Sequence, residues 1–213
     1  MTILLESLRE RDRGPLAAIL DECPVIALPR GSKRLARRMP PASLLVVEEG
    51  TVAVSRLPGP ATRQIAVALR RAGGILLPLE EDECLSAITD AWLTGLTPAA
   101  IRALHSSPVT AAALTEALLQ ALGCARESVR QFGRVRAADR LREKLLQLGR
   151  DHGHVGVGGI TLDLPLTHEL LAEMIGSSRE TVTWAFAELM RDGFVRRDGR
   201  SYRLAVSPEE LVS

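Results

Sequence analysis

Aromatic residues are scarce in this sequence of 213 residues, where three Phe, two Trp and one Tyr make up 3%. The core must therefore be filled by Leu, Val, Ile and Ala, because hydrophobic residues still account for 46%. Neither sign of charge dominates, since 27 Lys and Arg face 26 Asp and Glu and the net charge is +1. Bulk charge thus neither favours nor excludes a nucleic-acid partner, and any basic surface must be local.

Cysteine and histidine are too few and too scattered for the common metal sites. Cys23, Cys84 and Cys124 lie far apart and form no CxxC pair, whereas an iron–sulfur cluster needs about four thiolates. No His precedes His105, so the N-terminal half has no axial ligand for haem and no His ligands for a cupin enzyme. We predict no catalytic residue, no metal site and no cofactor.

Long uncharged apolar runs are also lacking. The N-terminal stretch MTILLESLRERDR carries charges where a signal peptide needs an apolar segment. Runs such as Leu44–Val47 and Ile75–Leu79 are far too short to span a bilayer. We therefore expect a cytoplasmic protein that does not contact a membrane.

Short apolar runs separated by Gly and Pro characterise the N-terminal half, after a short helical segment expected over residues 1–22. The runs are Val25–Leu28, Leu44–Val47, Val52–Val54, Ile65–Leu69, Ile75–Leu79 and Ile88–Leu93. Short strands at this spacing predict a small antiparallel β-barrel or jelly roll. The fold class is therefore α+β, with an effector-like β-barrel domain over residues 1–107. Thr97 followed by Pro98 is typical of a helix start at the end of this domain.

A long amphipathic helix is predicted from Pro108, in a dimerisation and hinge segment over residues 108–133. Its apolar face recurs at three- and four-residue spacing through Leu114, Leu118, Leu122, Ala125 and Val129. Such a face, sustained over many turns, predicts packing against a partner helix in a homodimer. The alternative is that this helix and the next, over Val135–Leu148, simply cover the barrel. The second of these helices begins the C-terminal domain, residues 134–213.

Two short helices joined at Gly176 carry the strongest functional signal. Thr167 is placed to cap the first helix and Gly176 to end it. Ser177 is expected to cap the second helix, with Glu180 completing a capping box. The second helix is expected to bury Val182, Phe186, Leu189 and Met190. Its opposite face is expected to expose Arg179, Glu180, Thr183 and Trp184.

That exposed face suits a DNA recognition helix, because base edges lie at the floor of the major groove. An Arg can bond both acceptors of guanine, and a Glu can accept from cytosine N4. We therefore predict Arg179, Glu180, Thr183 and Trp184 as base-contacting residues; the alternative is a helical hairpin with solvated charges. Asp198-Gly199 predicts the turn of a following hairpin. The arginines around its tip, where a wing would meet the DNA backbone, are Arg196, Arg197, Arg200 and Arg203.

Residues 166–206 resemble the C-terminal winged helix of the Crp/Fnr family of transcription factors. The string Gly176-Ser-Ser-Arg-Glu-Thr-Val182 is nearly identical to that of the cyclic-AMP-responsive members. The order of parts also matches: a barrel, a long dimer helix, a hinge near Gln131–Arg134 and a DNA domain. The resemblance implies a homodimeric regulator whose recognition helix, about residues 178–191, reads a palindromic operator in double-stranded DNA.

The resemblance also implies roles for individual residues. Arg179 and Glu180 are expected to contact bases. The residues expected to contact phosphates are Thr167, His168, Ser178, Thr181, Arg197, Gly199 and Arg200. Many relatives carry a second base-reading Arg four residues after the Glu, where this chain has Trp184. The Trp184 indole either contacts a thymine methyl or packs inward, and we therefore expect a G·C-reading half-site whose remaining positions differ from the usual one.

The nucleotide cradle of the family is missing from the N-terminal half. Ligand-binding relatives carry a Gly-Glu-x-x-Leu stretch followed by an Arg and a Ser or Thr. The stretch from Gly73 to Ala87 lacks that pattern, Leu85 stands where the Arg belongs, and Glu80–Glu83 add negative charge. A phosphate without a cation beside acids is unfavourable, so we expect no dependence on a cyclic nucleotide.

Partners other than DNA stay open at this point. A different small-molecule effector remains possible, and RNA polymerase is a further expected partner. The basic run from Arg30 to Arg38 fits DNA flanks, polymerase, an anionic ligand or a plain solvated loop. The alternative function is a jelly-roll ligand-binding protein or enzyme whose winged helix serves protein–protein contacts.

Overall fold

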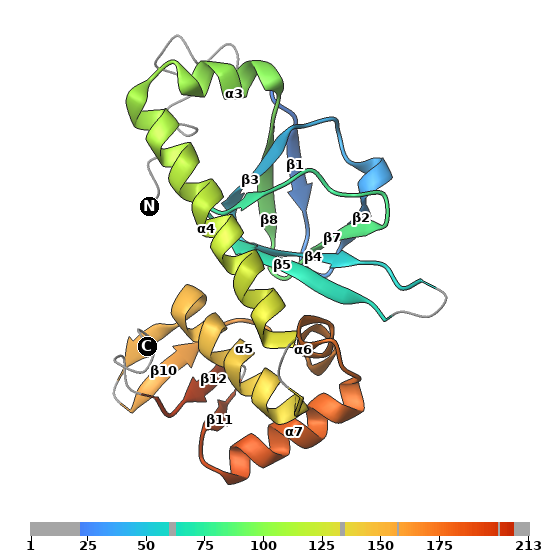
Figure 1. Cartoon of the computed structure of the whole chain (residues 1–213), viewed down its shortest axis with the longest axis vertical. Helices are drawn as coiled ribbons and strands as arrows, with labels where there is room; N and C mark the ends of the chain where they lie inside the picture. The colour runs from blue at the N-terminus through green and yellow to red at the C-terminus, as the bar shows by residue number, and fades with distance from the viewer. Residues whose placement is uncertain (1–21, 60–62, 133–134, 157, 200, 207–213) are drawn as a thin grey trace. The chain divides into compact units, whose positions relative to one another are not determined.

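The structure is a computed structural model that describes residues 22–59, 63–132, 135–156, 158–199 and 201–206 (Figure 1). The helical segment expected over residues 1–22 lies outside this part of the chain, except for Glu22. The chain divides into two compact units. One contains residues 1–56 and 67–126, and the other contains residues 57–66 and 127–213.

Two four-stranded sheets build the first unit. Their strand orders are β1-β8-β3-β6 and β2-β7-β4-β5. The strands are β1 (Val25–Leu28), β2 (Lys33–Leu35), β3 (Leu44–Glu49), β4 (Thr51–Arg56), β5 (Ile65–Arg71), β6 (Ile75–Leu76), β7 (Glu83–Ala87) and β8 (Ala91–Leu96). β8 pairs antiparallel with β1 and β3, and β7 pairs antiparallel with β2 and β4. The predicted antiparallel jelly-roll architecture is therefore confirmed.

Strand β3 explains why the apolar runs are continuous rather than alternating. Successive side chains of a strand point to opposite faces. Leu45 and Val47 belong to the cluster between the two sheets, while Leu44 and Val46 belong to a second cluster with the helices. All four side chains are buried. A strand covered on both faces needs apolar residues at every position.

Two strands were not predicted from the sequence. β2 falls in the basic run, and β7 begins at Glu83, the last residue of the acidic run. Conversely, the run Ile75–Leu79 forms a strand only over its first two residues, because Pro78 provides no N–H for a ladder. The turn between β3 and β4 lies at Gly50, whose φ of 80° suits glycine. A Cβ there would also lie 2.0 Å from the Asp90 carbonyl oxygen.

Two helices follow β8. Thr97 caps α3 (Pro98–His105) by accepting a hydrogen bond from the Ala100 N–H at 3.2 Å, as predicted from Thr97-Pro98. The long predicted helix is α4 (Pro108–Phe132). Ala113, Leu114 and Ala117 pack it against β3, β6 and α3 in the second core cluster.

Helix α4 is also long and apolar enough, by length and composition, to cross a membrane over Pro108–Arg130. This stretch is longer than the apolar runs named above, and it was not predicted as a candidate span. Its packing on the barrel accounts for the apolar residues of one face. Core helices pass the same composition test, so this stretch is weak evidence for a span.

Three helices and a four-stranded sheet make up most of the described part of the second unit. The helices are α5 (Ala137–His152), α6 (His168–Ile175) and α7 (Arg179–Arg191). The strands are β9 (His154–Gly156), β10 (Gly159–Leu162), β11 (Val195–Asp198) and β12 (Ser201–Leu204), in the sheet order β11-β12-β10-β9. Leu141, Leu145 and Leu148 are buried on the inner face of α5, as its periodicity predicted. The expected hinge near Gln131–Arg134 includes residues 133 and 134, which lie outside the described part.

Candidate DNA interface

Helix α6 is fixed at both ends by the residues that the sequence indicated. The Thr167 hydroxyl accepts a hydrogen bond from the Leu170 N–H at 3.1 Å, which caps the first turn. Gly176 ends the helix in the left-handed conformation, with φ 61° and ψ 45°. Leu170 and Ile175 are buried on its inner face. The guanidinium of Arg140 on α5 donates to the Ile175 carbonyl at 3.0 Å, so α6 is tied to α5 as well.

The cap of α7 differs by one residue from the prediction. Ser178, rather than Ser177, accepts from the Thr181 N–H at 3.1 Å, and the two hydroxyls lie 2.9 Å apart. The N–H of Ser177 instead turns back to the Ala172 carbonyl at 2.9 Å and completes the end of α6. The expected capping box with Glu180 was therefore wrong, because Thr181 occupies the third helical position.

One face of α7 is buried and the other is open. Val182, Ala185, Phe186 and Leu189 are buried on the inner face. Met190 was expected there, but 47% of its surface is exposed. The four predicted base-contacting residues lie together on the outer face, and we call them the base-reading face. Its members are Arg179, Glu180, Thr183 and Trp184, all of them exposed.

The members of the base-reading face differ in chemistry. The indole of Trp184 is 79% exposed, so the side chain does not pack inward. A hydrogen bond from its own backbone N–H, with a second from Ser178, holds the pKa of the Glu180 carboxyl below its ordinary value. The charges of Arg179 and Arg63 act in the same direction, so Glu180 is an ionised acceptor at neutral pH.

A hydrogen-bonded chain that the sequence did not reveal joins α6 to α7. The Thr183 hydroxyl donates to the Arg179 carbonyl oxygen at 2.9 Å. Nδ1 of His168 lies 2.9 Å from the same hydroxyl oxygen. The His168 ring also stacks on Phe186 with the ring centroids 5.3 Å apart. His168 was predicted only as a phosphate contact, and no sequence spacing indicated these partners.

The hairpin of β11 and β12 forms the wing. Asp198 pairs with Ser201, and Gly199 at the turn has φ 60°. Arg197 lies at this tip and donates its Nε–H to the Gly199 carbonyl at 3.2 Å. Arg203 forms an exposed ion pair with Asp198 at 3.0 Å, which neutralises part of the basic charge. Arg200 lies outside the described residues, so its predicted role stays a prediction.

The single tyrosine anchors the wing to the helices. The Tyr202 hydroxyl donates to the Leu166 carbonyl at 3.2 Å, and the Tyr202 ring contacts the Phe186 ring at a centroid distance of 5.1 Å. Both side chains are buried. A lone Tyr on a strand gives no signal in sequence, so this anchor was missed.

Helix α4 leaves part of its predicted dimer face open. Leu114 is 1% exposed and belongs to the barrel core, so its expected role in a dimer interface is corrected. Leu118 is half-buried against the same core. The exposed apolar residues farther along the helix form what we call the α4 stripe. It consists of Leu119, Leu122, Ala125 and Val129, of which Leu119 was not among the predicted residues.

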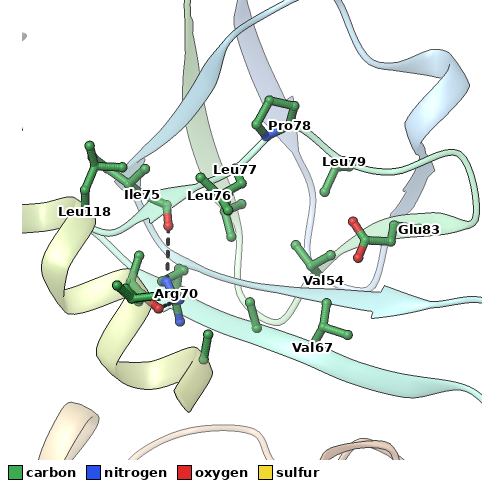
Figure 2. Close-up of a pocket in the computed structure, with 14 residues that line it drawn as sticks. Val54, Val67, Arg70, Ile75, Leu76, Leu77, Pro78, Leu79, Glu83 and Leu118 are labelled. Atoms are coloured by element: carbon green, nitrogen blue, oxygen red, sulfur yellow. Dashed lines mark hydrogen bonds between the residues drawn. The ribbon is translucent and has the colours of Figure 1, made fainter. Parts of the chain in front are cut away.

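A cavity of about 380 Å³ lies between the barrel and α4 (Figure 2). Its walls are mainly aliphatic, with the side chains of Arg70 and Glu83 as the charged members. The Arg70 guanidinium donates to the carbonyls of Ile75, Leu69 and Ala121 at 3.2, 2.9 and 3.2 Å. It therefore fastens β5 to β6 and α4 with three of its five N–H donors.

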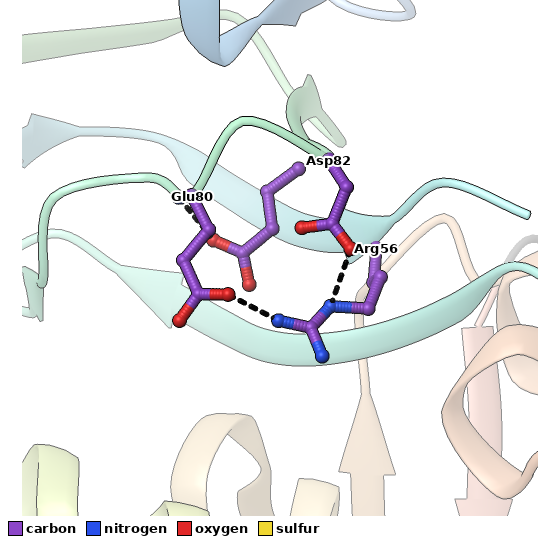
Figure 3. A network of polar contacts seen from close by, with 4 residues as sticks. Arg56, Glu80 and Asp82 are labelled. Atoms are coloured by element: carbon purple, nitrogen blue, oxygen red, sulfur yellow. Dashed lines mark hydrogen bonds and ion pairs between the residues drawn. The ribbon is translucent and has the colours of Figure 1, made fainter. Parts of the chain in front are cut away.

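The residues compared with a phosphate cradle do not form one. Leu85 is fully buried between the sheets and does not line the cavity. The acidic run folds back on Arg56 of β4, whose guanidinium pairs with Glu80 and, at 3.1 Å, with Asp82 (Figure 3). The Glu83 carboxylate accepts from the Glu80 N–H at 3.0 Å. The charged lining of this cavity therefore consists, among the described residues, of the Glu83 carboxylate and of Arg70, which is bonded to three carbonyls.

Comparisons with known proteins agree with this geometry. Residues 139–211 match the Crp-like helix-turn-helix domain. The C-terminal part is therefore a Crp-like helix-turn-helix domain, and this match together with the similar proteins supports a Crp/Fnr-type transcription regulator. A CRP-like cAMP-activated global transcriptional regulator of Mycobacterium tuberculosis is 23% identical over 198 residues, which cover 90% of this chain and 88% of the relative.

Solved structures of Crp/Fnr proteins share the fold. A CooA variant from Carboxydothermus hydrogenoformans aligns with a TM-score of 0.77 at 21% identity, covering 98% of this chain and 94% of that one. A Crp/Fnr-family transcriptional regulator from Thermus thermophilus aligns with a TM-score of 0.63 at 25% identity, covering 89% and 96%. This Crp/Fnr protein is a DNA-binding transcription regulator, and its family consists of regulators rather than enzymes.

Proposed function

We propose that this Crp/Fnr protein is a homodimer that reads a palindromic operator through α7, without a cyclic nucleotide. The observation that carries the proposal is the base-reading face. Arg179 and Glu180 are exposed in the first turn of a helix whose opposite side is buried. Base edges in the major groove are reached by side chains from the N-terminal turns of such a helix.

The first two residues of the face suit a G·C base pair. The Arg179 guanidinium can donate two hydrogen bonds to guanine O6 and N7. Glu180 can accept from cytosine N4, and its lowered pKa keeps it ionised at neutral pH. Trp184 lies one helical turn after Glu180, so its exposed indole can contact the thymine methyl of a neighbouring base pair. Thr183 keeps its methyl for such a contact, because its hydroxyl is bonded within the protein.

The phosphate contacts come from the segments beside this face. The Ser178 and Thr181 hydroxyls lie at the start of α7, and Thr167 and His168 lie at the start of α6. Backbone N–H groups at these helix starts favour anions. The wing adds Arg197, Gly199 and Arg200, of which Arg197 is exposed at the tip. These groups set the register on the duplex, while the base-reading face supplies specificity.

A second copy of the chain is the occupant that we propose for the α4 stripe. Leu119, Leu122 and Val129 are 63%, 57% and 72% exposed, and they recur at helical spacing on one long helix. Two such helices side by side would remove these side chains from water. A two-fold dimer presents two α7 helices, so its operator is a palindrome with half-sites about 34 Å apart.

Regulation by a cyclic nucleotide finds no support in the barrel. The cavity is aliphatic, Arg70 is bonded to three carbonyls and Glu83 faces the space. We therefore infer that operator binding needs no cyclic nucleotide. We also propose that the protein acts in the cytoplasm and that RNA polymerase is its protein partner. A regulator bound at a promoter acts where transcription starts.

Selection of bound duplexes from a random pool tests the proposal. The purified full chain is expected to enrich a palindrome with a G·C pair in each half-site, in the absence of any nucleotide. The matched variant Glu169→Gln changes a charge on α6 outside the base-reading face and is expected to enrich the same palindrome. A pool without an enriched palindrome would contradict the proposed function.

A further inference from the structure

His168 stands where α6, α7 and the wing meet. It is the first residue of α6, and its ring is partly buried against Phe186 of α7, with an angle of 28° between the ring planes. Nδ1 contacts the Thr183 hydroxyl oxygen at 2.9 Å. The ring orientation is therefore set by a stack on one side and a hydrogen bond on the other.

The direction of that hydrogen bond determines which nitrogen carries the proton. A hydroxyl has one proton, and Thr183 donates it to the Arg179 carbonyl at 2.9 Å. With the Thr183 proton on the Arg179 carbonyl, the Thr183 oxygen accepts from His168, and we assign the ring proton to Nδ1 on this basis. In the neutral ring Nε2 is left with a lone pair. A neutral His168 thus cannot donate to a phosphate through Nε2, and its lone pair repels the phosphate oxygens.

Partial burial and the charges around the ring favour its neutral form in the free protein. Partial burial, Arg179 of α7 and Arg197 of β11, in that order, lower the pKa of His168 below its ordinary value. Tyr202 of β12 reaches the same cluster through Phe186, and Glu169 follows His168 on α6. The same two arginines make the surroundings attractive to a DNA phosphate, whose negative charge favours the protonated ring.

We propose that His168 takes up a proton from solvent when the helix-turn-helix binds DNA, and that its Nε2–H then donates to a backbone phosphate. This inference rests on the proposed function, and it adds that operator affinity depends on pH through one residue per half-site. His168 is in this view a proton-linked positioning residue. It orients α6 on the duplex only in its charged form.

The sign of the linkage follows from the two states. The pKa of His168 is lowered in the free protein, and the negative charge of the phosphate raises it in the proposed complex. The gain in affinity is therefore fully present below the free-state pKa, and it is lost as the pH rises through the pKa of the complex. Between these two pKa values each half-site binds up to about one extra proton. The dissociation constant of a dimer then rises by up to roughly 100-fold per pH unit.

The test measures operator affinity by fluorescence anisotropy between pH 5.5 and 8.5 at fixed ionic strength, using the selected duplex. Wild-type protein is expected to bind more tightly as the pH falls. His168→Gln should bind weakly with a flat profile, and His168→Arg should bind tightly with a flat profile. His154→Gln, which removes an exposed histidine of β9, should keep the wild-type slope. Circular dichroism at each pH reports whether the variants are folded.

Calorimetry in buffers of different ionisation enthalpy counts the protons directly. Wild-type protein is expected to take up protons on binding, and His168→Arg to take up fewer by up to two per dimer. A wild-type slope retained in His168→Gln and His168→Arg would overturn the inference while leaving the proposed function intact. No sequence-specific binding by any variant at any pH would overturn both.

Discussion

Replacing Leu119 and Leu122 together by Ser removes two large side chains of the α4 stripe that lie outside the buried core clusters, of which Leu122 also lines the cavity between the barrel and α4. These leucines are 63% and 57% exposed in the single chain. Full burial of a Leu side chain contributes about 1.5–3 kcal/mol, so covering the remaining surface of each contributes about 1–2 kcal/mol. A symmetric dimer has four such side chains. We therefore expect the double substitution to weaken dimerisation by about 4–7 kcal/mol, which corresponds to a roughly 10³- to 10⁵-fold larger dissociation constant.

Sedimentation velocity over a concentration series measures this dissociation constant. Gln120→Ser is the matched control. Residue 120 is exposed between the two leucines, and a Ser there has the same low helix propensity as a Ser at position 119 or 122. The control should remain as dimeric as wild type, and both variants should keep the circular dichroism spectrum of a folded chain. The reasoning is refuted if the double variant keeps the wild-type dissociation constant, or if wild type itself sediments as a monomer at micromolar concentration.

Three further predictions follow from individual contacts. Trp184→Ala should leave the G·C position of the selected half-site unchanged and relax the preference at a neighbouring A·T position; an unchanged selected sequence would contradict the role of the indole. Gly176→Ala should lower the free energy of unfolding by about 1–2 kcal/mol, since the left-handed φ of 61° is unfavourable for other residues. Gly123→Ala, inside α4 with no atom near its added Cβ, should instead raise the free energy of unfolding by about 0.5–1 kcal/mol. Thermal melts in which Gly176→Ala and Gly123→Ala shift the stability in the same direction would contradict this account. Cyclic AMP at millimolar concentration should leave the melting temperature unchanged, whereas a ligand at 100 times its Kd stabilises by about 2.7 kcal/mol and would raise it.

Local sequence signals predicted the elements whose ends depend on one residue type. Thr97, Thr167 and Gly176 each occupy the position that their chemistry favours at a helix end. The hairpin turn at Gly199 follows from the same kind of signal. These features depend on hydrogen bonds between residues a few positions apart, so a short stretch of sequence contains both partners.

Features that depend on partners distant in sequence were not predictable. The cap of α7 is Ser178 and not the predicted Ser177. Two adjacent serines offer the same hydroxyl group, and the Ser177 N–H is already bonded to the end of α6. β2 was missed because a paired strand can carry charges on its exposed positions, as Lys33 does. β7 was missed because it begins at the acidic Glu83, whose burial among strand partners distant in sequence is not visible locally. Leu114 fits the apolar periodicity of α4 equally well as a core residue or as a dimer contact, and only its burial against the barrel distinguishes the two.

The base-reading face was predictable as a set, but its internal bonds were not. Helical periodicity places Arg179, Glu180, Thr183 and Trp184 together. The bond from His168 to Thr183 joins residues 15 positions apart on two helices, and it becomes visible only when both helices are placed. That bond is the origin of the proposed dependence of DNA binding on pH.

The most direct test of the central claim compares wild type and Arg179→Ala on the selected operator and on all its single base-pair variants. If Arg179 reads a guanine, the substitution should cost about 1–3 kcal/mol per contact on the parent site. Wild-type discrimination should then disappear at one symmetric G·C position in each half-site and persist at the others. An equal loss on every duplex, or no loss on the parent site, would contradict the claim that α7 reads DNA sequence through Arg179.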